Sequence, residues 1–583
     1  MIPIKRTIRR TGLLLVLALA LALSGCFAAP RPAAEQARFD DFLHRSFVAA
    51  VTVDSITQHT LVKHPEAFGI APDGLTLPTY DFPSEADITA ARESIVELMT
   101  FDPAQLTPEQ QRDYAVMVYL AGLFEPALDL HHYTDPLMGL DRVHALLPIV
   151  LSIAPLTSAA DVTMYLELVA RSGEIFDSVI RHEVERADRG LFMTDVQTEA
   201  ILGECEFFLA DRTTNVLLTS FEERLGALGL DPAETAALVA QNQHLFDTVV
   251  VPAYERLMAQ LEDLAGTGAD QNRWANPAER RASYALALKY LGTTRTPAQW
   301  ADRLDAYLPG LLAERYALTQ AAKETPDATV IDVMAAEDLL DLWLTRTADE
   351  FPALPDGVTA SLAPISESLK AIAPPAFYAL PRVDDPFVNL IQYDADWAVI
   401  DPAYFAGLMA HEGYPGHMLQ QTSLRSGSLP LYRQVTGFLA YIEGWAQHAE
   451  RRAIMSLDAD PSLKRLYLLN QEMDVLLFFR LDIGVHFEGW DLAAVTDYLM
   501  TVVPNWDEQP DGLAERLFYI AETRPLEAAP YATGLMELTE LHQLSVGDSS
   551  TPEHHRAFHE AYLGFGPAPF FLLREWMGLP ADV

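Results

Sequence analysis

Apolar residues recur three and four positions apart along most of the chain, which is the spacing of one buried face of an α-helix. The clearest runs of this kind span residues 37–51, 162–187, 250–265, 296–320, 403–414, 435–455, 463–487 and 491–503. Prolines preceded by Asp, Thr or Asn stand between several of these runs, and proline fits the first turn of a helix well. The pattern predicts a mainly α-helical protein.

One segment, residues 374–397, departs from the helical spacing. It carries several prolines and then a run rich in β-branched and aromatic residues at 387–393. Such a run predicts a short strand, which we place at the edge of a small sheet. Because the segment comes directly before the run that carries His411, we expect this minor sheet to lie next to that helix.

The chain has 583 residues, half of them apolar, which is enough to bury a large core. No long linker and no repeat of fixed period divides it, so residues 39–583 are expected to form a single large domain. The 82 acidic residues outnumber the 40 basic ones and give a net charge of −42. Binding to nucleic acid needs a basic face, so no nucleic-acid partner is expected.

The N-terminus has the features of an export signal. The first ten residues carry four basic side chains, and residues 13–23 are apolar but too short for a comfortable membrane span. The sequence LSGC at 23–26 then resembles a bacterial lipobox, which predicts a lipoprotein signal peptide at 1–26, lipidation of Cys26 and a location in the cell envelope. An ordinary signal peptide or a short anchor is the alternative. Residues 27–38, rich in Ala and Pro, are expected to form a flexible tether.

The segment HEGYPGH at 411–417 nearly matches the helical zinc motif H-E-x-x-H. In that motif two histidines four residues apart share one helical face and one ion, and the glutamate takes a proton from water. Here position 415 is proline, and the second histidine comes six residues after the first. Six residues are about 600° of rotation, so on a regular helix His411 and His417 would point to different sides.

Pro415 and Gly416 offer a solution to this spacing. Proline disfavours the helical conformation of the preceding residue, and glycine admits unusual torsion angles. A break at this point could bring His417 back beside His411, with Glu412 as the base. The alternative is a helix end followed by a turn that carries two histidines and no metal.

Two glutamates in the run YIEGWAQHAE supply a candidate third ligand. Glu443 and Glu450 are seven residues apart, so on a helix they share one face but lie roughly 10 Å apart along its axis. Only one of them can bind the same ion directly. Glu443 is favoured because the adjacent Gly444 lets another backbone approach, which leaves Glu450 near the ligands or in the substrate cleft. A solvated acidic face is the alternative.

Together these segments resemble the bacterial DUF885 family of proposed zinc-dependent peptidases. The resemblance rests on HEGYPGH at 411–417, EGWAQHAE at 443–450, RLDIGVHFEGW at 480–490 and FHEAYLGFGPAPF at 558–570, and it is densest over 380–575. It implies a large zincin-like helical fold with one Zn²⁺ held by His411, His417 and Glu443, and Glu412 as general base. An extended peptide bound along the strand at 387–393 would follow by analogy with other zincins.

Three further residues are candidates for supporting roles. His486 and Tyr531 are candidate donors to the oxyanion that forms during hydrolysis, and Asp482, four residues before His486, could orient its imidazole. A helix-terminal histidine with no catalytic role is the alternative for His486. The family pattern before the C-terminal tyrosine and glycine is only partly kept, since Tyr531 and Gly534 match while the residues before them do not.

A competing histidine pair lies near the C-terminus. His555 and His559 are four residues apart, but no glutamate follows the first of them, so the pair lacks the base of the zinc motif. We interpret His559 as structural or cleft-lining, and His554 and His555 as exposed.

The sequence thus predicts an exported, lipid-anchored, zinc-dependent metallohydrolase, and a peptidase acting on peptide substrates is the favoured interpretation. One alternative keeps the metal and changes the substrate to another amide or an ester. A second alternative is a non-catalytic surface-binding lipoprotein with a degenerate zincin site. Two histidines and a carboxylate also suit divalent ions other than zinc.

Overall fold

The computed structural model describes residues 32–71, 74–140, 142–268, 277–324, 329–370, 372–547 and 551–581. Within them the chain is mainly α-helical, with one three-stranded sheet, which confirms the expected fold class. The predicted signal peptide and Cys26 lie outside the described residues. No helix of the described part has both the length and the apolar character needed to cross a bilayer.

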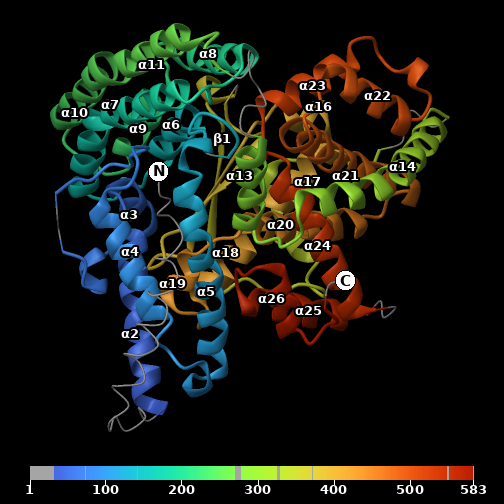
Figure 1. Ribbon diagram of the computed structural model, residues 1–583, viewed down its shortest axis with the longest axis horizontal. Coiled ribbons are helices and arrows are strands. Elements are labelled where there is room, and N and C mark those ends of the chain that lie inside the picture. Colours follow the sequence, from blue (N-terminus) through green and yellow to red (C-terminus); the bar gives the residue numbers. More distant parts are fainter. Residues whose placement is uncertain are drawn as a thin grey trace, which may run out of the picture.

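The N-terminal half consists of long antiparallel helices and a compact bundle beside them (Figure 1). Its helices are α2 (Pro32–Val51), α3 (Ser55–Leu61), α4 (Glu85–Leu98), α5 (Pro108–Asp129), α6 (Val143–Ile153), α7 (Ala159–Asp188), α8 (Asp195–Leu209), α9 (Val216–Gly226), α10 (Pro232–Leu245) and α11 (Val251–Leu264). The buried apolar residues of α6 to α11 form a core of their own, which residues 365–372 complete.

The expected tether at 27–38 is wrong for its second part, because α2 begins at Pro32. Glu35 is buried in the first turns of this helix and forms an ion pair with Arg38 at 2.7 Å. Phe39 then packs edge-on against Phe101, with the ring centroids 5.0 Å apart. These contacts fix residues 32–38 in the fold, while residues 27–31 lie outside the described part of the chain.

Three helices lead from the N-terminal half to the sheet: α13 (Pro277–Tyr290), α14 (Pro297–Ala322) and α15 (Ala336–Arg346). Helix α14 starts as its sequence predicts. Thr296 and Gln299 form a reciprocal capping box, and Pro297 occupies the first turn.

The sheet has the order β1-β3-β2, formed by β1 (Thr359–Pro364), β2 (Ala376–Ala379) and β3 (Val388–Tyr393). Strand β3 matches the predicted strand, but its expected position at the edge is wrong. It pairs in parallel with β1, from Thr359 opposite Val388, and antiparallel with β2, from Ala376 opposite Tyr393. The edge strand that packs against the helix carrying His411 is β2.

The C-terminal half builds the largest apolar core. Its helices are α16 (Trp397–Ile400), α17 (Pro402–Glu412), α18 (His417–Ser426), α19 (Leu431–Val435), α20 (Leu439–Met455), α21 (Pro461–Ile483), α22 (Leu492–Val502), α23 (Leu513–Thr523), α24 (Ala529–Val546), α25 (Pro552–Phe565) and α26 (Phe570–Trp576). A buried ion pair between Arg433 of α19 and Asp113 of α5, 2.8 Å long, ties this half to the N-terminal helices.

Helices α20 and α24 approach each other unusually closely, because two glycines face each other. A Cβ atom on Gly444 would lie 2.7 Å from the carbonyl carbon of Gly534. The sequence-based expectation that Gly444 admits a second backbone is therefore confirmed. The close contact brings a residue of α24, Tyr531, toward the face of α20 that carries Glu443.

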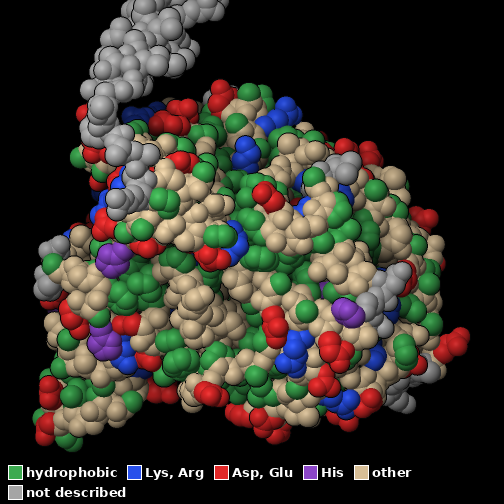
Figure 2. Space-filling view, turned by 90° about the horizontal axis from the view of Figure 1, so that it is seen from below, with side chains coloured by type: hydrophobic (Ala, Val, Ile, Leu, Met, Phe, Trp, Pro, Cys, Tyr) green, Lys and Arg blue, Asp and Glu red, His purple; other side chains and the backbone are tan. Residues whose placement is uncertain are grey.

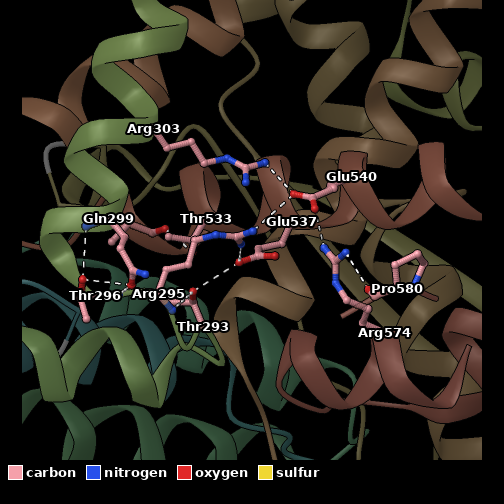
Figure 3. A network of polar contacts seen from close by, with 11 residues as sticks. Thr293, Arg295, Thr296, Gln299, Arg303, Thr533, Glu537, Glu540, Arg574 and Pro580 are labelled. Carbon is pink, nitrogen blue, oxygen red and sulfur yellow. Dashed lines mark hydrogen bonds and ion pairs between the residues drawn. The ribbon is translucent and has the colours of Figure 1, made fainter. Parts of the chain in front are cut away.

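An ionic network anchors α24 to α14 and α26 (Figure 3). The carboxylate of Glu540 binds Arg303 at 2.8 Å and Arg574 at 2.6 Å, while Glu537 pairs with Arg295. These charges are partly buried, so solvent screens them less than it screens surface pairs. Acidic side chains are scattered over the face of the molecule that Figure 2 shows.

Candidate metal centre

The HEGYPGH segment forms a break between two helices. Helix α17 ends at Glu412, and α18 begins at His417. Between them the N–H of Gly416 donates to the carbonyl of Ala410 at 3.0 Å, and a Cβ atom on Gly416 would overlap the carbonyl oxygen of His411. Only glycine therefore fits this turn.

The break brings the two histidines together. The ring centroids of His411 and His417 are 4.8 Å apart, and the ring planes are almost perpendicular, at 89°. The expectation that a break at Pro415 and Gly416 returns His417 to the side of His411 is confirmed. The segment is also a helix end followed by a turn, so this part of the alternative interpretation is present as well.

Glu443 of α20 meets both imidazoles. Its Oε2 atom lies 3.4 Å from Nε2 of His411 and 3.5 Å from Nε2 of His417. One ligand atom from each of the three residues lies within 4.8 Å of the others. The structure thus brings together the three residues that the sequence nominated as ligands.

The donor set fits a divalent cation. Oε2 of Glu443 is buried and has no hydrogen-bond partner among the described residues, and a buried carboxylate oxygen in this state is costly unless a cation meets it. Burial alone would raise the pKa of Glu443, but the two histidines lower it to about 2, so the group is an anion. Two imidazoles and a carboxylate are a zinc ligand set.

Glu450 approaches His411 from the other edge of the ring. Its Oε2 atom lies 3.5 Å from Nδ1 of His411, and its Oε1 atom accepts a hydrogen bond from the Tyr467 hydroxyl at 2.6 Å. Burial lowers the pKa of His411, but the carboxylates of Glu443 and Glu450 outweigh this effect and raise it well above its usual value. The expected helical face with two glutamates is therefore present, with each glutamate on a different nitrogen of one imidazole.

Glu412 is buried beside the histidines, with 6% of its surface exposed. Burial raises the pKa of its carboxyl group, and the nearby His411 and His417 oppose this rise only in part. Together with His411 and Glu450 it lines a cavity of about 230 Å³. A carboxylate of raised pKa at the wall of a cavity is suited to accept a proton.

Tyr531 of α24 closes the cluster. Its ring is roughly parallel to that of His411, with centroids 6.5 Å apart. The carboxylate of Glu443, and burial after it, raise the pKa of Tyr531 well above its usual value, so its hydroxyl keeps its proton. Tyr531 also lines a second, outer cavity of about 650 Å³, which shares Tyr404, Gln471 and Val475 with the inner one.

Comparison with known protein families identifies the family of this chain. The sequence profile of the family described as "Bacterial protein of unknown function (DUF885)" matches residues 76–577, a range that includes the whole candidate centre. The chain belongs to the DUF885 family. This match confirms the family resemblance seen in the sequence motifs, and the family's description states no activity.

Two solved structures share the fold of this DUF885 protein. One is a candidate lipoprotein from Colwellia psychrerythraea, with a TM-score of 0.73 and 17% identity over 93% of this chain and 99% of that chain. The other is a candidate lipoprotein of unknown function from Shewanella oneidensis, with a TM-score of 0.56 and 16% identity over 94% and 100% of the two chains. Comparison with curated protein sequences finds no match.

His486 does not join the cluster formed by His411, His417 and Glu443. It lies in the π-helical turn Gly484–Glu488, where its Nε2 atom is 2.8 Å from the carbonyl of Ala521. Asp482 is 3.7 Å from this nitrogen. The carboxylate of Asp482 instead accepts hydrogen bonds from the Tyr284 hydroxyl and the Leu526 N–H.

Asp482 and His486, the two expected supporting residues, therefore lie at different positions relative to the two cavities. Asp482 lines the outer cavity, whereas His486 lines neither of the two cavities. Because His486 lies outside both cavities, its role as a donor to the oxyanion stays a prediction without support from the geometry.

Sequence reasoning missed two residues that position the centre. The indole Nε1 of Trp445 donates to the carbonyls of Pro415 and Gly416, both at 3.1 Å, and so holds the turn before His417. Tyr467 holds Glu450 from α21. Trp445 directly follows Gly444 in a matched family segment, which was the available signal. Tyr467 belongs to no motif and could not be found by spacing.

One of the three C-terminal histidines, His555, is more buried than expected. His559 has no exposed surface and His554 is exposed, as interpreted from the sequence. The expectation for His555 is wrong, because only 6% of its surface is exposed. The ring of His555 stacks on that of His542 from α24, which covers it.

Proposed function

We propose that this DUF885 protein is a metal-dependent hydrolase that cleaves peptide bonds. The observation that carries the proposal is the convergence of His411, His417 and Glu443 around a buried carboxylate oxygen that has no hydrogen-bond partner among the described residues. A zinc ion held by these residues would supply Lewis acidity, which promotes the attack of water on a carbonyl group.

The remaining residues supply proton transfer and orientation. Glu412 would accept a proton from the attacking water and pass it to the leaving amine, a role that its raised pKa favours. Tyr531 would donate a hydrogen bond to the oxyanion, since its hydroxyl stays protonated. Glu450 would keep His411 in the orientation that presents Nε2 to the cluster.

The position of β2 supports a peptide as the substrate. Pro374, Pro375 and Ala376 line the inner cavity together with His411 and Glu412. The backbone of Tyr378, also in β2, lies close enough to Glu412 to lower the pKa of its carboxyl group. An extended peptide could add to the edge of β2 through backbone hydrogen bonds and pass in front of the base. This role, first assigned to the strand at 387–393, passes to β2 because β3 is central.

Hydrolysis of a peptide library by the zinc-loaded protein tests this proposal. Glu412→Gln is expected to lower kcat/KM at least 100-fold, the usual contribution of a general base, while zinc stays bound. The matched control is Glu560→Gln, an exposed glutamate of α25, which should cleave at the wild-type rate. Cleavage of esters or other amides but not peptides would select the first alternative. No turnover of any substrate by the zinc-bound protein would select the non-catalytic binding lipoprotein.

We also propose that the protein is anchored in the cell envelope by a lipid on Cys26. The support is the LSGC sequence at 23–26 and the likeness of the fold to two candidate lipoproteins. In cells, Cys26→Ala should move the protein from the membrane fraction to the soluble fraction. The same distribution of both proteins would contradict the anchor and favour an ordinary signal peptide.

A further inference from the structure

Four histidines from three helices meet on the side of α20 that faces away from the candidate metal centre. They are His448 of α20, His542 of α24, and His555 and His559 of α25. On a helix, His448 is rotated by about 140° from Glu443 and about 160° from Glu450. The two clusters therefore lie on different faces of the same helix.

The ring nitrogens of these histidines point at one another. Nε2 of His448 lies 2.9 Å from Nε2 of His559, and Nε2 of His542 lies 2.9 Å from Nδ1 of His555. The ring centroids of His448 and His542 are 4.8 Å apart and link the two pairs. One ligand nitrogen from each of His448, His542 and His559 lies within 4.8 Å of the others.

The environment keeps these imidazoles neutral. His448 and His559 are buried, and burial lowers the pKa of both well below the usual value of histidine, with further lowering by neighbouring histidines and Arg452. Burial, with His555 and Arg452, lowers the pKa of His542 to about 4. A neutral imidazole has one nitrogen lone pair to offer, which is the form that binds metal ions.

His559 is already oriented as a ligand. Its Nδ1 atom lies 2.8 Å from the carbonyl oxygen of Glu350, so Nδ1 must carry the hydrogen and Nε2 the lone pair. This arrangement, in which one ring nitrogen is bound to a carbonyl and the other carries the lone pair that a cation can bind, is typical of metal-binding histidines. Stacking on Phe351, with centroids 4.1 Å apart, fixes the ring.

We propose that His448, His542 and His559 form a second metal site, which binds a zinc-class transition-metal ion through imidazole nitrogens alone. Imidazole ligands suit Zn²⁺, Cu²⁺ and Ni²⁺, and three of them can complete a zinc site together with solvent. His542 is partly exposed, which gives the ion a route from solvent. The cation replaces the hydrogen bond between the facing Nε2 atoms of His448 and His559.

We assign this site a structural role, because the one glutamate that directly follows any of its three histidines, Glu560 after His559, is exposed, whereas His559 is fully buried. Its ion would brace the wall behind the first centre. The ring of His559 packs edge-on against Trp445, with centroids 5.5 Å apart, and Trp445 donates to the turn at Pro415 and Gly416. Metal binding at the histidine cluster thus stabilises the element that carries His417.

The test uses a protein that lacks the first centre, His411→Ala with His417→Ala, so its outcome does not depend on the proposed hydrolase. Zinc is titrated into this background protein and into the same protein with His542→Gln added. The matched control adds His554→Gln, an exposed histidine of the same helix α25. We expect the background and control proteins to bind one more equivalent of zinc than the His542→Gln protein.

Two further readings guard against a variant that fails to fold. In the background protein, which keeps every histidine of the cluster, zinc should raise the unfolding temperature, and X-ray absorption at the zinc edge should show imidazole as the only protein ligand. His448→Gln, checked by circular dichroism, should also lose the one equivalent. Equal zinc binding with and without His542→Gln, or no effect of zinc on the unfolding temperature of the background protein, would overturn the proposal.

Discussion

Glu450 lies against the imidazole of His411, with its Oε2 atom 3.5 Å from Nδ1, on the ring edge opposite Glu443. A carboxylate in this place fixes the orientation of the ring and raises the basicity of the ligand nitrogen. We expect Glu450→Gln to weaken zinc binding by about 10–100-fold without unfolding the protein. Competition with a chelator measures the affinity.

The control for this prediction is Tyr467→Phe. It removes the hydroxyl that donates to Glu450 but leaves the carboxylate, so its effect on zinc affinity should be smaller. An unchanged zinc affinity of Glu450→Gln would show that the carboxylate does not support His411 in this way.

The contact between Gly444 and Gly534 predicts a large effect of a single methyl group. Gly444→Ala would place a Cβ atom 2.7 Å from the backbone of α24, so the helices must separate. We expect the free energy of unfolding to fall by about 1–3 kcal/mol, the usual cost of overpacking. Activity should also fall, because α24 carries Tyr531.

Gly203→Ala is the matched control for Gly444→Ala. Gly203 lies inside α8, and an added Cβ would meet no atom within 4 Å among the described residues. Alanine should stabilise this helix by about 0.5–1 kcal/mol. Urea unfolding measures the free energy of unfolding of both variants, which should fall for Gly444→Ala and rise for Gly203→Ala. A destabilisation that is no larger for Gly444→Ala would refute the close approach of the helices.

The buried carboxyl of Asp482 predicts a pH-dependent stability. Burial raises its pKa to about 7, although hydrogen bonds from Tyr284 and Leu526 act in the opposite direction. The unfolded value is about 3.9, so between about pH 4 and pH 7 the folded chain holds a proton that the unfolded chain has lost. The free energy of unfolding therefore falls as pH rises through this range.

Asp482→Asn removes this titration. Its stability should decline less than that of the wild type between about pH 4 and pH 7, by on the order of a few kcal/mol. The control Asp497→Asn changes an exposed residue of α22 and should keep the wild-type pH profile. Parallel profiles of the wild type and Asp482→Asn would contradict the prediction.

Trp445 predicts a link between a core residue and the metal centre. Trp445→Phe keeps most of the ring but removes both hydrogen bonds to the turn before His417. We expect a loss of about 1–3 kcal/mol in the free energy of unfolding, since the carbonyls of Pro415 and Gly416 lose the indole donor and only that of Gly416 keeps the N–H of Gln420, together with weaker zinc binding.

Trp300→Phe is the control for the indole. Trp300 is equally buried, but its Nε1 atom has no hydrogen-bond partner among the described residues. Its replacement should change stability through packing alone and leave zinc binding unaffected. A zinc affinity of Trp445→Phe equal to that of Trp300→Phe would mean that the indole does not position His417.

The candidate centre could be predicted from the sequence because its signals are local. His411, Glu412 and His417 lie in one segment, and the break between them is marked by Pro415 and Gly416. Glu443 lies in a segment whose apolar spacing clearly predicts a helix, and the adjacent Gly444 indicates that another backbone can approach closely. Chemistry and spacing made these residues candidates, and the family resemblance then assigned them as a ligand set and a base before any contact was known.

What the sequence could not reveal depends on contacts between distant segments. The central place of β3 depends on its pairing with β1 on one side and β2 on the other, and the residue pattern of 387–393 does not show which segments pair with it. The contact between His448 and His559 joins residues 111 positions apart, so no motif spacing reports it. His486 shows the reverse case, in which a plausible motif position turns out to contact a backbone carbonyl instead.

Anomalous diffraction at the zinc absorption edge, on crystals of the protein grown with zinc, tests the central claim most directly. The account predicts a peak between Nε2 of His411, Nε2 of His417 and Oε2 of Glu443, which disappears in His411→Ala and persists in His554→Ala. Zinc-containing crystals with no peak at this position would contradict the metal centre and the hydrolase built on it.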